Sequence, residues 1–406
     1  MNSASIVLIT TLSMAIAAAI AGSPALAVVD RPRLSRRIAT LDGLRGFLAL
    51  SVFLHHGLVY RGYLETGEWR GTPGLPDMLG SGAVALFFMV TGYLFWGHLI
   101  ACRGRPDWMH LYISRVFRIG PLFMLATLMA LLATFAAAPG LIVAPAALLG
   151  QIVPYALLGF MPLGDVNGFA TPLLLAGVAW SLHYEWLFYL ALPLLAFAAR
   201  RPAWHLSGSI ALLLGSLVCL SFGNGPVQDK LIFITTGLFS LGMLSASLHA
   251  LGVRRTFGWA GSVACLTLLA ITMGCFSTAN CRAAMLMLGV VFFLVASGCS
   301  LFGLLNCRAA IRLGELSYGI YLLHGLVLAA VLRPAPIRAL VLSSPLWHGA
   351  LLLATMLVLI LAATLAHVHV ERRGVRLGRR AASWAASWAA ARRPLIALSP
   401  EGLEPR

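Results

Sequence analysis

The stretch LDGLRGFLALSVFLHH, from Leu41 to His56, places an arginine at the start of an apolar run and two histidines deep inside it. Arg45 and His56 are eleven positions apart, and eleven steps of about 100° make three helical turns plus roughly 20°. In a helix the two side chains therefore share a face, with His56 about 16 Å further along the axis. His55 lies about 80° around the helix from Arg45. The stretch predicts a membrane helix that is polar on one face at two depths, with His56 rather than His55 on that face.

The composition extends this interpretation to the whole chain. Of the 406 residues, 60% are hydrophobic and 10% are charged, and the mean hydropathy is +0.90. These values exclude a soluble domain and indicate a polytopic membrane protein. The net charge of +16 comes from short arginine clusters between apolar runs, and Lys230 is the only lysine. No basic segment interleaves aromatic residues on a soluble element, so we expect no nucleic-acid partner.

Apolar runs long enough to cross a bilayer need about 17–25 residues. Ten runs meet this requirement and predict an all-α polytopic membrane protein with about ten core transmembrane helices. They lie at 46–64, 82–100, 117–138, 178–198, 206–222, 229–249, 257–277, 283–305, 313–333 and 347–369.

The run at 141–161 carries Pro145 and Pro154, and charge asymmetry decides whether it spans the membrane. Cytoplasmic loops are enriched in lysine and arginine. With 31–37 inside and 141–161 not spanning, both core ends are cytoplasmic and most basic residues fall inside. The exceptions are Arg61, Arg70, Lys230, Arg282, Arg333 and Arg338. We therefore expect 139–177 to dip into the membrane or lie on it from the outer face.

The two ends of the chain differ from the core, which we place at 31–375. Residues 1–30 form an apolar N-terminal extension: Ile6–Ile20 followed by Ala25-Leu26-Ala27 is typical of a signal peptide. Arginines follow it directly, however, so it is also compatible with an extra helix or with an extension that the protein does not need. Residues 376–406 form a cytoplasmic basic tail. Trp384 and Trp388 between arginine pairs suit a short helix on the membrane surface, or the tail is disordered.

Ionisable residues inside spans are costly and mark candidate functional sites. His56, Glu185 and His324 lie about 12, 10 and 13 Å below the outer ends of their predicted helices, so three distant segments bring polar groups to one depth. Ser317, Tyr321 and His324 follow an i, i+4, i+7 pattern that leads to that depth. Two structural alternatives stay open, because a buried histidine often forms a helix–helix hydrogen bond and Glu185 could belong to a structural pair.

Arg115 and Arg118 lie three positions apart at the cytoplasmic end of the third predicted helix. They could serve as positive-inside anchors. Arg45 joins them on the same side of the membrane, and three guanidiniums suit a multiply phosphorylated ligand. We assign packing or interface roles to Trp180, Trp186 and Tyr189, and structural or lipid-interface roles to His55, His98, His183 and His348.

The sequence indicates no metal site. His367 and His369 are two positions apart and point in different directions on a helix. The seven cysteines form no CxxC pair, although Cys275 and Cys281 flank one predicted outer turn and could form a disulfide.

Six stretches together resemble the acyltransferase-3 family of bacterial inner-membrane O-acyltransferases. In chain order they are LDGLRGFLALSVFLHH, AVALFFMVTGYLF, SRVFRIGPL, WSLHYEWLFYLALPLL, LGELSYGIYLLHG and HVHVERR. The chain departs from the family pattern at Ala85, where an acidic residue is frequent, and at Arg373, where proline is frequent. The resemblance implies a ten-helix core that moves an acyl group, expected to be acetyl, from cytoplasmic acyl-CoA to a hydroxyl of a glycan or lipid-linked sugar. Some members of the family carry a fused periplasmic esterase-like domain, and we expect this chain to be without one.

Carried over by position, the family's essential arginine and histidine fall on Arg45 and His56, its arginine pair on Arg115 and Arg118, and its glutamate on Glu185. We expect the three arginines to bind CoA phosphates. His56 would act as general base or take the acyl group itself, and Glu185 would orient the imidazole. The other substrate-contact candidates are Ser317, Tyr321 and His324.

The competing hypothesis is a polytopic proton-coupled transporter or glycan exporter, with His56, Glu185 and His324 as a proton relay. Such transporters often contain internal repeats, and we find no repeat in this sequence.

Overall fold

A computed structural model describes residues 3–30, 38–137, 140–222, 226–253 and 258–391, and within these ranges the chain is helical with no β-strand. All ten predicted spans form helices. They are α2 (Ala39–Thr66), α3 (Leu75–Ala101), α4 (Trp108–Ala137), α6 (Ala179–Leu195), α7 (Pro202–Phe222), α8 (Val227–Ala250), α9 (Gly258–Cys275), α10 (Arg282–Ala296), α11 (Arg308–Leu332) and α13 (Pro345–Ala366). The further α-helices are α1 (Ser3–Gly22), α5 (Pro145–Ala156), α12 (Ala335–Ser343) and α14 (Arg372–Ala391).

The prediction of an all-α polytopic membrane protein is confirmed. In the described part of the chain, 8 helices are long and apolar enough to cross a membrane. Apart from α1, all of them coincide with predicted spans. The other predicted spans are α2, which carries four charged residues, and α6 and α10, which have 17 and 15 residues.

The run at 141–161 does not form a spanning helix. It contains α5, whose 12 residues cover about 18 Å, well short of the roughly 30 Å hydrocarbon core. The prediction that this segment enters or lies on the membrane from one face is compatible with that length. The orientation of the core, with both ends cytoplasmic, stays a prediction.

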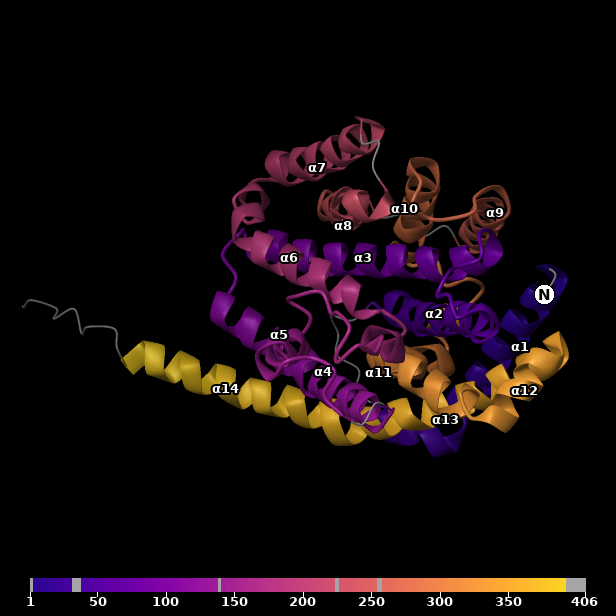
Figure 1. Cartoon of the computed structure of the whole chain (residues 1–406). Helices are drawn as coiled ribbons and strands as arrows, with labels where there is room; N and C mark the ends of the chain where they lie inside the picture. The colour runs from indigo at the N-terminus through magenta and orange to yellow at the C-terminus, as the bar shows by residue number, and fades with distance from the viewer. Residues whose placement is uncertain (1–2, 31–37, 138–139, 223–225, 254–257, 392–406) are drawn as a thin grey trace, which may run out of the picture.

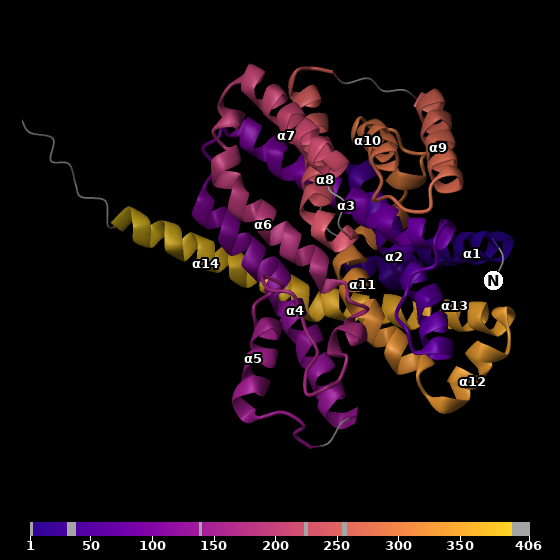
Figure 2. The same cartoon turned by 45° about the horizontal axis from the view of Figure 1, so that its top comes forward.

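The helices pack around α2 and α3, which lie side by side in the middle of the molecule (Figure 1). On one side α8 packs along α3, and α7 and α10 pack against α8. On the other side α11 packs along α2, and α13 and α1 pack against α11. Figure 2 shows α6 between α3 and α4, with α14 running alongside α4. The α2, α3, α4, α6 and α11 helices thereby enclose the region where the predicted site residues lie.

Glycines allow two close helix contacts. A Cβ on Gly46 of α2 would overlap Leu313 and Gly314 of α11, and a Cβ on Gly314 would overlap the Asp42 carbonyl oxygen. The α3–α8 contact has the same reciprocal form, with Gly92 against Phe239 and Gly242 against Met89. Small residues let helix backbones approach closely where the membrane itself supplies no hydrophobic drive between helices. These contacts fix how α11 is placed along α2.

The N-terminal extension is packed onto the core. The α1 helix lies against α11 and α13, and the Arg312 guanidinium donates to the Asp30 carboxylate at 2.7 and 2.8 Å. It also donates to the carbonyls of Ala21 and Ser23. This hydrogen bonding lowers the pKa of Asp30 below its ordinary value. Residues 3–22 are helical and packed on the core, and the choice between a signal peptide, an extra helix and an extension that the protein does not need stays a prediction.

The C-terminal part differs from the prediction in two places. A single π-helical turn, His367–Glu371, joins α13 directly to α14, so the tail is a continuous helix as far as Ala391 rather than a separate short one. The disordered-tail alternative is therefore wrong for residues 376–391, and residues 392–406 lie outside the described part. The predicted helix over 283–305 was too long, because α10 ends at Ala296 and Gly298 has a φ of +103° that stops the helix.

Candidate functional site

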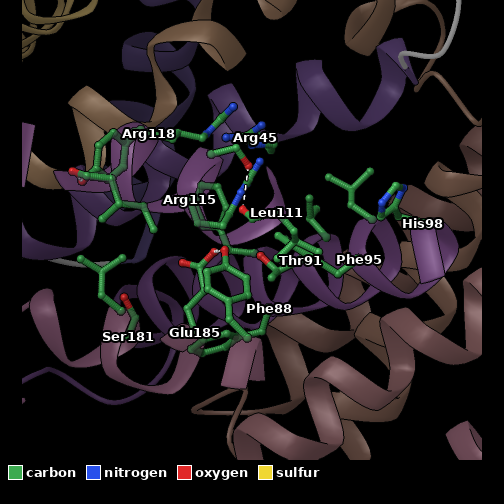
Figure 3. A pocket seen from close by; sticks show the side chains of 18 of the residues that line it. Arg45, Phe88, Thr91, Phe95, His98, Leu111, Arg115, Arg118, Ser181 and Glu185 are labelled. Carbon is green, nitrogen blue, oxygen red and sulfur yellow. Dashed lines mark hydrogen bonds between the residues drawn. The ribbon is translucent and has the colours of Figure 1, made fainter. Parts of the chain in front are cut away.

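A cavity of about 690 Å³ lies between α2, α3, α4, α6 and α11 (Figure 3). Arg45, Arg115 and Arg118 line it together with Glu185, Ser317 and Tyr321. Six candidates drawn from four distant segments thus share one cavity.

The three arginines are grouped on one side of the cavity in Figure 3, with Glu185 and Ser181 across from them. Arg115 lies with its guanidinium carbon 5.1 Å from the centre of the Phe95 ring. The Nε of Arg115 is buried and has no hydrogen-bond partner in the described part of the chain. Since Arg105 also lines the cavity and the acidic residues among its described lining are Asp107 and Glu185, the cavity carries excess positive charge. Such a cavity suits an anionic ligand.

Glu185 is held inside the cavity by a neighbour on its own helix. The Tyr189 hydroxyl, four positions later on α6, donates to Glu185 Oε1. Tyr189 is itself fixed, because the Tyr112 hydroxyl donates to its carbonyl at 2.9 Å and Phe95 packs on its ring. The sequence predicts only a packing or interface role for Tyr189. The i, i+4 spacing from Glu185 was the signal that could have placed it in the site.

Tyr321 marks the end of the cavity toward the histidines. Its hydroxyl hydrogen-bonds the Ser181 hydroxyl at 2.8 Å, which joins α11 to α6. Phe87 of α3 packs edge-on against the Tyr321 ring with the ring centres 5.8 Å apart. On its other side, the Tyr321 ring lies 6.2 Å from His324. Tyr321 therefore borders both the cavity and His324, and Ser181 and Phe87 hold it in this position.

His56 and His324 meet beyond Tyr321. The Nε2 of His324 lies 3.0 Å from Nδ1 of His56, and the two rings stack with their centres 4.9 Å apart. His324 is fully buried. The indole of Trp69, from the loop between α2 and α3, stacks on the other side of His56 at 5.9 Å. Two of the three groups predicted at one depth thus contact each other, and Trp69 joins them without having been predicted.

Glu185 is the third of these groups, and it is directed into the arginine-lined cavity. Its hydrogen-bond partner is Tyr189, whereas His56 hydrogen-bonds His324. Matching depths along helix axes could not reveal this difference, because depth says nothing about the direction in which a side chain leaves its helix.

His55 faces α3. Its Nδ1 lies 2.7 Å from the Pro76 carbonyl oxygen, and its ring occupies the space above Gly80. His348 also has a helix-packing role, with Nε2 3.1 Å from the Gly57 carbonyl oxygen. His98, for which the sequence predicts a structural or lipid-interface role, is among the residues that line the cavity.

The remaining sequence candidates lie apart from these groups. Cys275 and Cys281 are free thiols, so the structure contains no disulfide between them. Among the described residues no three His, Cys, Asp or Glu side chains are grouped as they would be in a metal site.

Comparison with known proteins identifies the chain. A family profile described as an acyltransferase domain, that of acyltransferase-3, matches residues 38–365. The chain belongs to the acyltransferase-3 family. It is also 29% identical over 380 residues to acyltransferase MdmB of Streptomyces mycarofaciens, covering 84% of this chain and 92% of that protein. No solved structure matches. The chain is therefore a membrane acyltransferase, and the transporter hypothesis finds no support in these matches.

Proposed function

We propose that this acyltransferase takes an acyl group from acyl-CoA on the cytoplasmic side of a bacterial inner membrane. It passes the group to a hydroxyl of a glycan or lipid-linked sugar, and we expect the acyl group to be acetyl. The observation that carries the proposal is the cavity with Arg45, Arg115 and Arg118 on one side of Tyr321 and the His56–His324 pair on the other. This arrangement would bind the charged end of a long acyl donor at the arginines and place its reactive end at the histidines.

The donor fits this separation. CoA is a polyanion whose phosphates suit several guanidiniums, and its thioester lies at the end of a long flexible arm. Arg45 and His56 lie on one continuous helix, which keeps them about 16 Å apart. The arm would extend from the arginines past Tyr321, so the Ser181–Tyr321 hydrogen bond would open to admit it.

The reaction places His56 next to the acceptor hydroxyl. His56 accepts the hydroxyl proton while the acceptor oxygen attacks the thioester carbonyl. The C–S bond then breaks, and the leaving thiolate takes the proton from His56 to give the free thiol of CoA. Transfer through an acyl-histidine is the second route: His56 itself attacks the thioester carbonyl, the C–S bond breaks and the CoA thiolate leaves. The acceptor hydroxyl then takes the acyl group from His56, and its proton goes to the thiolate.

Glu185 would act on the donor side of the site. The carboxylate lies in the arginine-lined cavity and accepts from Tyr189. It would help to position the guanidiniums, in place of the contact with His56 that we expected from the sequence. Ser317 and Tyr321 would line the path of the thioester.

The aromatic side chains beside His56 support a sugar as acceptor. Trp69 packs edge-on against Tyr60 and Tyr63, with ring centres 5.8 and 5.6 Å away, and stacks on His56. Aromatic faces of this kind pack well against the apolar face of a sugar ring. The loop that carries Trp69 joins the outer ends of α2 and α3 in the predicted orientation.

Thiol release tests the proposal. Purified protein in detergent is mixed with acetyl-CoA and candidate sugars, and release of free CoA that depends on the sugar is the expected result. The His56→Ala protein is the control for uncatalysed hydrolysis. Comparing glycan masses of wild-type and deletion cells would then identify the acceptor through a lost acyl increment. Failure of every CoA thioester to bind or react would contradict the proposal.

A further inference from the structure

The contacts of His324 determine which of its ring nitrogens carries the proton. Its Nδ1 lies 3.2 Å from the Ile320 carbonyl oxygen. A carbonyl oxygen can only accept, so Nδ1 must be the donor. His324 is fully buried between helices, and in the described part of the chain no carboxylate hydrogen-bonds it, so a charged ring there would be very costly. In the neutral ring with a proton on Nδ1, Nε2 is an acceptor.

This assignment fixes the protons of His56 as well. The Nδ1 of His56 lies 3.0 Å from Nε2 of His324 and 3.1 Å from the Val52 carbonyl oxygen. With a proton on Nδ1, His56 donates toward both acceptors. The opposite arrangement, with His324 Nε2 as donor, would leave a bare nitrogen facing the Val52 oxygen and another facing the Ile320 oxygen. One pair of tautomers therefore satisfies all three contacts.

The same assignment leaves a lone pair on Nε2 of His56. No hydrogen bond to this atom occurs among the described residues. Trp69 covers the face of the ring rather than its edge, and the side chain is half-buried rather than fully enclosed. Nε2 is thus the atom that can accept a proton from a hydroxyl brought to the site.

We propose that His324 is a positioning residue that holds His56 in the tautomer with a free Nε2. The proposal rests on the proposed role of His56 as base. During transfer the acceptor proton moves to Nε2 of His56 and then to the leaving thiolate, while the Nδ1 proton stays between the two rings. His324 thereby takes the place of the carboxylate that orients histidine in many acyl-transfer enzymes. A neutral acceptor avoids burying a further charge in the membrane interior.

Side-chain shape provides the test. In His324→Gln, the amide oxygen reaches the position of Nε2 and can still accept from His56. His324→Asn places its amide near Nδ1 instead, too short to reach His56, and His324→Leu removes the acceptor. We expect His324→Gln to keep kcat within about fivefold of wild type. His324→Asn and His324→Leu should lower kcat about ten- to a hundredfold, the loss expected when a buried group is left without its neutral hydrogen-bond partner.

A merely structural role would give a different result. His348 is the matched control, because it is fully buried, bonds the α2 backbone at Gly57 and does not touch His56. His348→Leu and His324→Leu should lower the Tm to a similar degree, but His324→Leu alone should lower kcat. The KM for acyl-CoA should stay unchanged in all of them, because the cavity lies on the other side of Tyr321.

A double-mutant cycle separates this proposal from the role of His56. If His324 acts through His56, then adding His324→Leu to His56→Ala should cause no further loss of the residual rate. Full activity in His324→Leu would overturn the proposal. So would a His324→Gln protein that binds acyl-CoA normally yet is as slow as His324→Leu. Normal turnover by His56→Ala would instead refute the proposed function of His56.

Discussion

Replacing Arg115 and Arg118 together by lysine tests whether the cavity binds a phosphorylated donor. Both side chains line the cavity, and the Nε of Arg115 is buried without a hydrogen-bond partner in the described part of the chain. Lysine keeps the positive charge but loses the planar fork that binds two phosphate oxygens at once. The substitution therefore separates the geometry of the pair from its charge.

The expected loss follows from the contacts that lysine cannot reproduce. A hydrogen bond to a charged group contributes about 1.5–3 kcal/mol. Since about 1.36 kcal/mol corresponds to a factor of ten, losing most of one such contact should raise the KM for acyl-CoA about ten- to a hundredfold. The KM for the acceptor should barely change, because we expect the acceptor to bind next to His56, beyond Tyr321.

The assay measures thiol release by purified protein while one substrate is varied and the other is held at saturation. Arg200 and Arg201 provide the matched control, because they stack on Phe197 and Trp204 and are not among the described residues that line the cavity. Their double-lysine variant should keep both KM values. An unchanged KM for acyl-CoA in the Arg115→Lys, Arg118→Lys protein would refute the reasoning and leave the pair as topological anchors. An equal rise of the KM for acyl-CoA in the control variant would mean that the effect comes from surface arginines rather than from the cavity.

Three further predictions concern the histidines, the topology and the N-terminal helix. His56→Ala should abolish transfer, whereas His55→Ala should keep much of it per folded molecule, because His55 faces α3; equal loss at equal expression would contradict the face argument. A reporter fused after Asp165 should lie outside and one after Arg255 inside, and the reverse readings would mean that 141–161 spans. Deleting residues 1–30 should lower the Tm because Arg312 loses its partners, and adding Arg312→Leu should restore part of it; an unchanged Tm would show that the segment is dispensable.

Hydropathy was sufficient to predict the helices of this chain because a membrane imposes a minimum length on them. All ten predicted spans are helices, including α2, which carries four charged residues. The helix ends were harder to predict. A pattern of apolar residues continues past Gly298, where the backbone leaves the helical region, and it gives no sign that α13 and α14 join through a π turn.

The sequence predicted which residues contribute to the candidate site but not which of them contact one another. Spacing on one helix placed His55 away from the face that carries Arg45, and in the structure Arg45 lines the cavity while His55 lies against α3. Pairings between helices depend on how each helix is rotated, and depth alone leaves that rotation free. This is why Glu185 was matched to His56 on the basis of depth, although the structure directs it toward Tyr189 and the cavity.

The contact between α2 and α11 explains why the two histidines meet. Gly46 of α2 lies directly against Gly314 of α11, and each histidine follows its glycine by ten positions. Because both helices run in the same direction, equal offsets bring His56 and His324 to the same level, about 15 Å from the glycine contact. Ten positions are one heptad plus three, the spacing between a and d positions that face a partner helix. A bulky residue at either glycine would shift one helix along or away from the other and separate Nδ1 of His56 from Nε2 of His324. The glycines near the cavity thus determine the geometry of the base on its far side.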